Sequence, residues 1–207
     1  MTAGDRPGPG HDGSIDVTRP SDPTVRILAV SGSLRARSTN SAVLHTARAI
    51  APAGVAVVVY DGVGALPHFD PDADTDDARP AAVGALRDAV HDADALLLCT
   101  PEYAGALPGS FKNALDWLIG DADPRSLYEK PVGWINASPR GGAEAAHASL
   151  RSVLGFAHAT IVEPAVATIP VTSALVMPDG TIHDADVRRQ IAEVVATLAA
   201  AARSANG

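Results

Sequence analysis

The ten residues SGSLRARSTN (31–40) carry an unusual density of hydrogen-bond donors between an apolar run and a helix-like run. Guanidinium groups bind phosphate oxygens through paired hydrogen bonds, and the unpaired backbone N–H groups at a helix N-terminus attract anions. The decapeptide therefore predicts an anion site. The candidate side-chain donors are Ser33, Ser38, Thr39 and Asn40, with Arg35 or Arg37. The structural alternative is that Ser38 or Thr39 only caps the helix and that both arginines are solvated.

The charge pattern around this decapeptide favours the anion site. Between Asp22 and Asp61 there is no acidic residue, although the chain as a whole has a formal net charge of -8. The arginines within that interval are Arg26, Arg35, Arg37 and Arg48. The loop is neither a P-loop (GxxxxGK[ST]) nor a GxGxxG loop. The overall acidic balance argues against nucleic acid or an anionic membrane as a partner.

A second stretch, TPEYAGALPGSFKNALDWLIG (100–120), predicts a rigid loop that leads into a helix. Pro101, Gly105 and Pro108 restrict its backbone, and Tyr103 stands at its tip. Such a loop can present backbone N–H and C=O groups to a flat polar ring. Tyr103 either flanks such a ring or is a surface residue, whereas Phe111 and Trp117 are expected in the core or at an interface.

The elements that position both stretches are apolar strands alternating with amphipathic helices. The predicted strands are 25–31, 55–60, 95–100, 132–137 and 160–169. Periodic apolar residues predict helices around residues 43–50, 83–90, 111–118, 146–154 and 187–198, and Asp179-Gly180 predicts a turn before the last one. This alternation predicts an α/β fold, a doubly wound, five-stranded parallel sheet of order 2-1-3-4-5 in a three-layer α/β/α arrangement. In that order the loops after the first and third strands meet at the switch point, where ligands bind.

The motifs GSLRARSTN and PEYAGALPGSFKNALDW together resemble the NADPH-dependent FMN reductases of the flavodoxin-like superfamily, which include quinone, chromate and azo-dye reductases. The resemblance covers residues 25 to about 203, and it also includes ASPRGGAEAAHASLRSVL (137–154). This sequence departs from the family pattern at Ala104, where many members carry Asn or His, and at Phe111, where Leu is usual.

The resemblance implies non-covalent FMN, with its phosphate held by the decapeptide and its ring edged by two later loops. The cofactor-binding residues it implies are Ser33, Arg35, Ser38, Thr39, Asn40, Pro101, Glu102, Tyr103, Ala104, Gly105, Ser138, Gly141 and Gly142. It implies no obligate catalytic side chain, because the flavin carries the redox chemistry between NAD(P)H and a second substrate. Arg37 or Arg140 could attract the 2′-phosphate of NADPH, and the helix with Lys112, Asn113, Asp116 and Trp117 resembles a dimer-forming helix.

The resemblance implies an NAD(P)H-dependent oxidoreductase that forms a homodimer or homotetramer and reduces a quinone, chromate, an azo compound or a similar acceptor, or free flavin. We expect it to be cytoplasmic. Two alternatives remain open. One is a flavodoxin-like electron carrier without its own NAD(P)H turnover, and the other is a regulatory protein of the same fold without a cofactor.

The remaining features point to no further chemistry. Residues 1–23, rich in Gly, Pro and Asp, are expected to be a flexible tail before a single domain at 24–203. The run DPDADTDDAR (70–79) lacks the Gly and Glu of an EF-hand and predicts an exposed acidic loop. The seven histidines form no metal motif. Cys99 is the single cysteine, which excludes an internal disulfide, and it is expected in the core.

Overall fold

The computed structural model describes residues 1, 24–139 and 142–206. The regular elements alternate between strand and helix, as the apolar pattern predicts. They are β1 (Val25–Ser31), α1 (Thr39–Ala49), β2 (Val55–Tyr60), α2 (Ala81–His91), β3 (Ala95–Cys99), α3 (Gly109–Ile119), β4 (Pro131–Asn136), α4 (Glu144–Phe156), β5 (Thr160–Thr168) and α5 (Ala185–Ala205). Three short 3₁₀ turns are η1 (Gly62–Ala65), η2 (Pro71–Ala73) and η3 (Ser173–Leu175). No helix in the described part of the chain is long and apolar enough to cross a membrane.

The five strands form one parallel sheet in the order β2-β1-β3-β4-β5, which confirms the predicted topology. β1 lies between β2 and β3, so the chain reverses its direction of winding beside β1. The carboxyl ends of β1 and β3 are in register, with Ser31 opposite Cys99. The loops that follow these two strands therefore start side by side, at the place where doubly wound sheets bind ligands.

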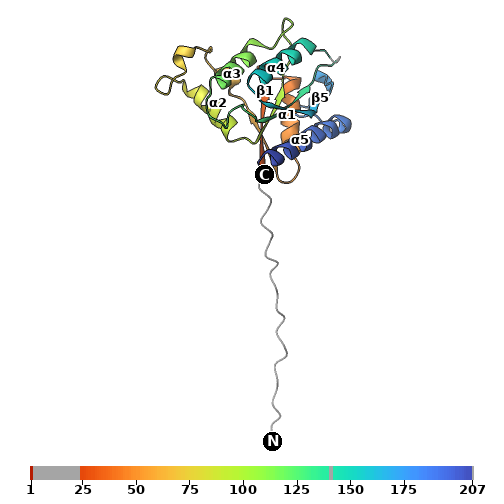
Figure 1. Cartoon of the computed structure of the whole chain (residues 1–207). Helices are drawn as coiled ribbons and strands as arrows, with labels where there is room; N and C mark the ends of the chain where they lie inside the picture. Colours follow the sequence, from red (N-terminus) through yellow and green to blue (C-terminus); the bar gives the residue numbers. More distant parts are fainter. Residues whose placement is uncertain (2–23, 140–141, 207) are drawn as a thin grey trace.

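Two hydrophobic cores cover the two faces of the sheet, which gives the three layers that the sequence predicts (Figure 1). One core joins the sheet to α1 and α5, including Leu44 and Ile191, and the other joins it to α2, α3 and α4, including Leu86 and Leu150. Strands in the middle of the sheet are buried on both faces, and all five residues of β3 are buried. Such strands read as continuous apolar runs, which is why the sequence reveals them.

The segment between β2 and α2 packs more closely than its acidic composition predicts. The Trp117 side chain of α3 is fully buried, and its Nε1 donates to the carbonyl oxygen of Pro67 at 2.9 Å. Asn113 also donates to that oxygen and accepts from the N–H of Phe69. Two residues of α3 that the family resemblance implies for a dimer helix thus make contacts within this chain.

The expectation of a fully exposed acidic loop is wrong at Asp74. Its side chain is 8% exposed and pairs with the buried guanidinium of Arg87 on α2 at 2.7 Å. Arg87 also donates to the carbonyl oxygen of Trp117, which satisfies a backbone group near the end of α3. Burial opposes ionisation of Asp74, but its hydrogen bonds with Arg87 and Arg79 lower the pKa of this carboxyl overall. The sequence could not reveal this, because Arg87 reaches Asp74 only after α2 has docked.

A buried lysine binds the carbonyl oxygens at the C-terminal end of α2, at the end of the sheet opposite the switch point. Lys130, 9% exposed, donates from Nζ to the carbonyl oxygens of Val90 and Ala93 at 2.7 and 2.6 Å. Burial lowers the pKa of this ammonium to about 8, and the nearby Asp94 opposes the shift in part.

We expect this lysine to make stability depend on pH under alkaline conditions. Above about pH 8 the folded chain releases a proton that the unfolded chain keeps up to about pH 10.5, so the free energy of unfolding rises with pH in this window. The rise should be about 2 kcal/mol. Urea titrations from pH 8 to 10.5 of the wild type and of Lys130→Met, which lacks the ionisable group, measure it. If the free energies of unfolding of the two proteins changed equally with pH, Lys130 would not be the group responsible.

A cavity at the switch point: the candidate cofactor site

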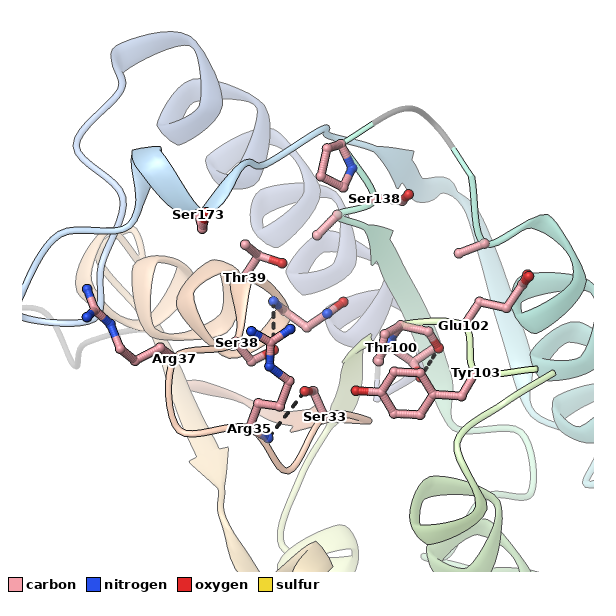
Figure 2. Close-up of a pocket in the computed structure, with 15 residues that line it drawn as sticks. Ser33, Arg35, Arg37, Ser38, Thr39, Thr100, Glu102, Tyr103, Ser138 and Ser173 are labelled. Carbon is pink, nitrogen blue, oxygen red and sulfur yellow. Dashed lines mark hydrogen bonds between the residues drawn. The ribbon is translucent and has the colours of Figure 1, made fainter. Parts of the chain in front are cut away.

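A cavity of about 490 Å³ opens at the carboxyl ends of β1, β3 and β4 (Figure 2). This volume lies within the range of roughly 300–1,000 Å³ that is typical of cofactor and small-molecule sites. Its lining comes from four separate segments of the chain. The lining residues are Ser33, Arg35, Arg37, Ser38, Thr39, Asn40, Thr100, Pro101, Glu102, Tyr103, Ala137, Ser138, Pro139, Ala143 and Ser173.

The decapeptide after β1 forms one wall of the cavity. Ser38 is the N-cap of α1, and its Oγ accepts a hydrogen bond from the N–H of Asn40 at 3.2 Å. The first turn of α1 contains no acidic residue, so the positive end of the helix faces the cavity without a neutralising carboxylate. The capping alternative is thus correct for Ser38. A cap and an anion site are compatible here, because Ser38 satisfies only one of the free N–H groups of the helix end.

Ser31 has a structural role in this wall. Its Oγ lies 3.0 Å from the Oγ of Ser41 on α1, and it also accepts from the N–H of Ser33 at 3.2 Å. The first residues of the loop are therefore tied to the helix that follows them. Ser33 is 8% exposed, and its Oγ accepts from the N–H of Arg35. These bonds hold the loop in one shape before any ligand is present.

A buried thiol orients the amide of Asn40. Cys99, fully buried at the end of β3 as expected for a core residue, donates from Sγ to Oδ1 of Asn40 at 3.2 Å. Because the thiol takes up the oxygen of the amide, the NH₂ group of Asn40 remains available as a donor. Burial raises the pKa of the Cys99 thiol far above its usual value, so this residue stays protonated and is a poor nucleophile.

The two arginines of the loop point in different directions. In Figure 2, the Arg35 side chain extends among Ser33, Ser38 and Thr39, whereas Arg37 points away from these residues toward the outside of the cavity. Neither guanidinium forms an ion pair with another described residue. Arg35 is thus the arginine of the loop that can reach an anion at the start of α1.

The loop after β3 forms the second wall and begins with a tight turn. Tyr103 and Ala106 exchange two backbone hydrogen bonds of 3.1 Å each, across Ala104 and Gly105. Ala104 and Gly105 have φ values of 51° and 71°, in the left-handed region that favours Gly or Asn. They do not line the cavity, but their turn carries Tyr103, which lines it and is 49% exposed.

Glu102 joins the second wall to the third. Its Oε2 accepts a hydrogen bond from the N–H of Ala146 at 3.1 Å, so it caps the first turn of α4. The third wall, after β4, is ordered by Asn136, which accepts from the N–H of Ser138 and donates to the carbonyl oxygen of Gly142. Gly142 therefore supports this loop without lining the cavity. The hydrogen bond with α4 fixes the position of the Glu102 carboxylate, whereas Arg35 and Arg37 are the positively charged groups of the lining.

The structure brings together most of the expected site residues and adds others. The nine that line the cavity are Ser33, Arg35, Ser38, Thr39, Asn40, Pro101, Glu102, Tyr103 and Ser138. Gly141 and Arg140 lie outside the described residues. Sequence reasoning missed Thr100, Ala137, Pro139, Ala143 and Ser173. Ser173 follows β5, and the rule that ligands bind at the carboxyl ends of parallel strands could have drawn attention to it.

Comparison with known proteins agrees with this geometry. The family model described as NADPH-dependent FMN reductase matches residues 25–172, which contain every described residue that lines the cavity except Ser173. The chain belongs to the NADPH-dependent FMN reductase family. It is therefore an oxidoreductase that uses FMN, with NAD(P)H as the electron donor.

Several proteins similar to this chain have names that state an activity. The chain is 35% identical to a quinone reductase of Escherichia coli over 139 residues, which cover 66% of this chain and 73% of that protein. It is 31% identical to a probable NADPH:quinone oxidoreductase of Oryza sativa over 187 residues, covering 86% and 92% of the two chains. The solved structure of FerB, a flavoenzyme NAD(P)H:(acceptor) oxidoreductase from Paracoccus denitrificans, superposes with a TM-score of 0.74 at 26% identity and covers 87% of this chain and 98% of that one.

The donors in the cavity fit the cofactor of this FMN reductase family. A phosphate dianion requires several donors. The start of α1 supplies hydroxyls, an oriented amide and the Arg35 guanidinium, which pairs with no carboxylate in the described part of the chain. A flat ring with polar edges requires apolar surface with a few polar groups beside it. The rest of the cavity combines Pro101, Tyr103, Ala137 and Ala143 with Thr100, Glu102 and Ser138.

Proposed function

We propose that this FMN reductase is an NAD(P)H-dependent quinone reductase that holds FMN in the cavity at the switch point. The observation that carries the proposal is the composition of that cavity. At the N-terminus of α1, hydroxyl groups and Arg35, which has no ion-pair partner among the described residues, line the cavity, and the cavity continues between the loops after β3 and β4. The names of the relatives from E. coli and O. sativa support a quinone as the acceptor.

The residues of the first wall would hold the phosphate. Ser33, Ser38, Thr39 and the amide of Asn40 would donate hydrogen bonds, and Arg35 would add a charge-assisted pair of donors. The residues of the second and third walls, Pro101 to Tyr103 and Ser138, would orient the ring. The loop bonds made by Ser31, Asn136 and Glu102 stiffen these walls, so little entropy is lost when the cofactor binds.

When bound, FMN supplies the redox chemistry, because it accepts a hydride from NAD(P)H and returns electrons to the second substrate. The protein contributes binding and orientation. No carboxylate or imidazole is needed as an acid or base in the hydride step, and Glu102 is already engaged with the N–H of Ala146. Tyr103 stands half-exposed at the mouth, where it would bound the space that nicotinamide and quinone enter in turn.

The proposal extends to the domain bounds, the oligomeric state and the location of the protein. Residues 24–203 would form the FMN-binding domain, and the family resemblance supports a homodimer or homotetramer. A cytoplasmic location would fit the dependence on NAD(P)H. Chromate, azo compounds and free flavin are other acceptors to include in any assay.

Anaerobic reduction tests this function directly. We expect the purified protein to bind FMN, and its flavin absorption to bleach when NADPH is added. Addition of a benzoquinone should then restore the absorption and release the hydroquinone. A yellow protein that NADPH does not bleach would instead be an electron carrier. A protein that stays colourless with excess FMN would be the cofactor-free regulatory protein, and the proposal would fail.

A further inference from the structure

A second, smaller cavity borders the decapeptide on its outer side. It has a volume of about 220 Å³ and lies between the outward face of α1 and the hairpin in which Val176 pairs with Ile182. We call it the hairpin cleft. It shares Arg37 and Ser38 with the main cavity, so the two spaces are neighbours along the same loop.

The hairpin cleft carries an excess of positive charge. Arg37 and Arg48 line it, and neither forms an ion pair with another described residue. His45 also lines the cleft, on α1 three residues before Arg48, but its Nδ1 is buried, so this nitrogen cannot meet a ligand in the cleft. Burial and the positive charge of Arg48 lower the pKa of His45.

The acidic residue of the cleft, Asp179, is already engaged in the hairpin turn. Its Oδ1 accepts from the N–H and the hydroxyl of Thr181 at 2.9 and 2.8 Å, and its Oδ2 lies 3.5 Å from Nε2 of His183. The two guanidinium groups, of Arg37 and Arg48, are therefore the charged groups of the cleft that remain to bind a ligand. Two guanidinium groups beside one small space suit a phosphomonoester, because each guanidinium donates a pair of hydrogen bonds to phosphate oxygens.

We propose that the hairpin cleft binds the 2′-phosphate of NADPH and thereby selects NADPH over NADH. The proposal rests on the proposed function, in which the nicotinamide ring enters the main cavity. NADPH and NADH differ only in that phosphate, so a site that discriminates between them must lie near the adenosine ribose. In the proposed pose the adenosine ribose would lie against the outer side of the decapeptide, and the hairpin cleft, which shares Arg37 and Ser38 with the main cavity, is the space there of a size for one phosphate.

The direction of Arg37 supports this assignment. It points away from Ser33, Ser38 and Thr39, the residues assigned to the FMN phosphate, so the two phosphates would use different arginines (Figure 2). Arg48 lies one further turn along α1 beyond His45, outside the main cavity. A change at Arg48 can therefore alter the choice of dinucleotide without touching the residues that would hold FMN.

The ratio of kcat/KM for NADPH to that for NADH tests the proposal. We expect the wild type to prefer NADPH, and Arg48→Gln to lower the ratio about tenfold, the loss expected for one charge-assisted hydrogen bond, while kcat/KM for NADH stays unchanged. Arg37→Gln should lower the ratio by a similar factor. Arg203→Gln removes the same charge at the end of α5, outside the cleft, and should leave the ratio as in the wild type.

A binding measurement without turnover separates this proposal from the proposed function. With excess FMN present, calorimetry should show that adenosine 2′,5′-bisphosphate binds about tenfold more tightly than ADP to the wild type, and that Arg48→Gln loses this difference. If the wild type oxidises both nucleotides but prefers NADH, or if Arg48→Gln keeps the wild-type ratio, the hairpin cleft is not the 2′-phosphate site. The proposed reductase activity would still hold in that case. If neither nucleotide is oxidised, the proposed function fails, and the calorimetry still decides whether the cleft recognises the phosphate.

Discussion

Gly32→Ala is expected to abolish tight FMN binding, with a loss of affinity of about a hundredfold or more. Gly32 is the first residue after β1, and its N–H donates to the carbonyl oxygen of Cys99 at 2.9 Å. A Cβ at this position would lie 2.2 Å from Oγ1 and 2.6 Å from Cβ of Thr100, and 3.1 Å from the ring of Phe111. Thr100 is too short to move aside, so the loops after β1 and β3 would have to separate, and both form walls of the site.

The same clash should reduce stability, because overpacking a closely packed site costs about 1–3 kcal/mol. The affinity is measured by flavin fluorescence quenching and the stability by urea denaturation. Gly84→Ala on α2 is the matched control, because no atom lies within 4 Å of the Cβ it would introduce, and it should keep wild-type affinity. Adding Thr100→Gly to Gly32→Ala removes both of the closest contacts and should restore part of the binding. Wild-type affinity in Gly32→Ala alone would show that the loops do not form the site in this arrangement.

Arg35→Ala should lower the affinity for FMN by about ten- to a hundredfold, because it removes a charged hydrogen-bond donor worth roughly 1.5–3 kcal/mol. Arg35 is exposed and forms no ion pair with another described residue, so its removal should leave the stability of the fold nearly unchanged. The affinity of the variant should also depend less on salt than that of the wild type. Equilibrium titration with FMN at two ionic strengths measures both effects.

Two further variants give this test its controls. Arg35→Lys keeps the charge but not the fork of donors, and its affinity should lie between those of the wild type and Arg35→Ala. Arg26→Ala removes an equal charge at the other end of β1 and should not change the affinity. If Arg35→Ala binds FMN as tightly as the wild type, Arg35 does not hold the phosphate.

The sequence predicted the fold and its topology almost completely. Five apolar runs separated by amphipathic periods leave few arrangements for a chain with right-handed crossovers, and the observed sheet has the order expected. The site loops followed from that topology, because the carboxyl ends of adjacent parallel strands lie at one edge of the sheet. Nine of the expected residues, from Ser33 to Ser138, line one cavity for this reason.

Features that depend on contacts between distant segments could not be predicted in this way. The loop after β5 brings Ser173 to the cavity; the strand-end rule marks this loop as a candidate, but only the path of the chain after β5 decides which of its residues reaches the cavity. Glu102, expected at the edge of the ring, uses its carboxylate to cap α4 because the first turn of that helix lies against the loop after β3. Asp74 is buried because α2 carries Arg87 to it across the segment that precedes the helix.

By itself, the sequence determined the type of site, since residue types and their distance from strand ends are local properties of the chain. It predicted an anion-binding loop, a rigid second loop and a fold that places them together. Only the tertiary structure decided which way each side chain points. Arg35 and Arg37 are two residues apart in one loop, yet one lies among the donors of the main cavity and the other reaches the hairpin cleft. The physical reason is that a side chain's direction is set by the packing of segments far apart in the sequence, here α1 against the hairpin before α5.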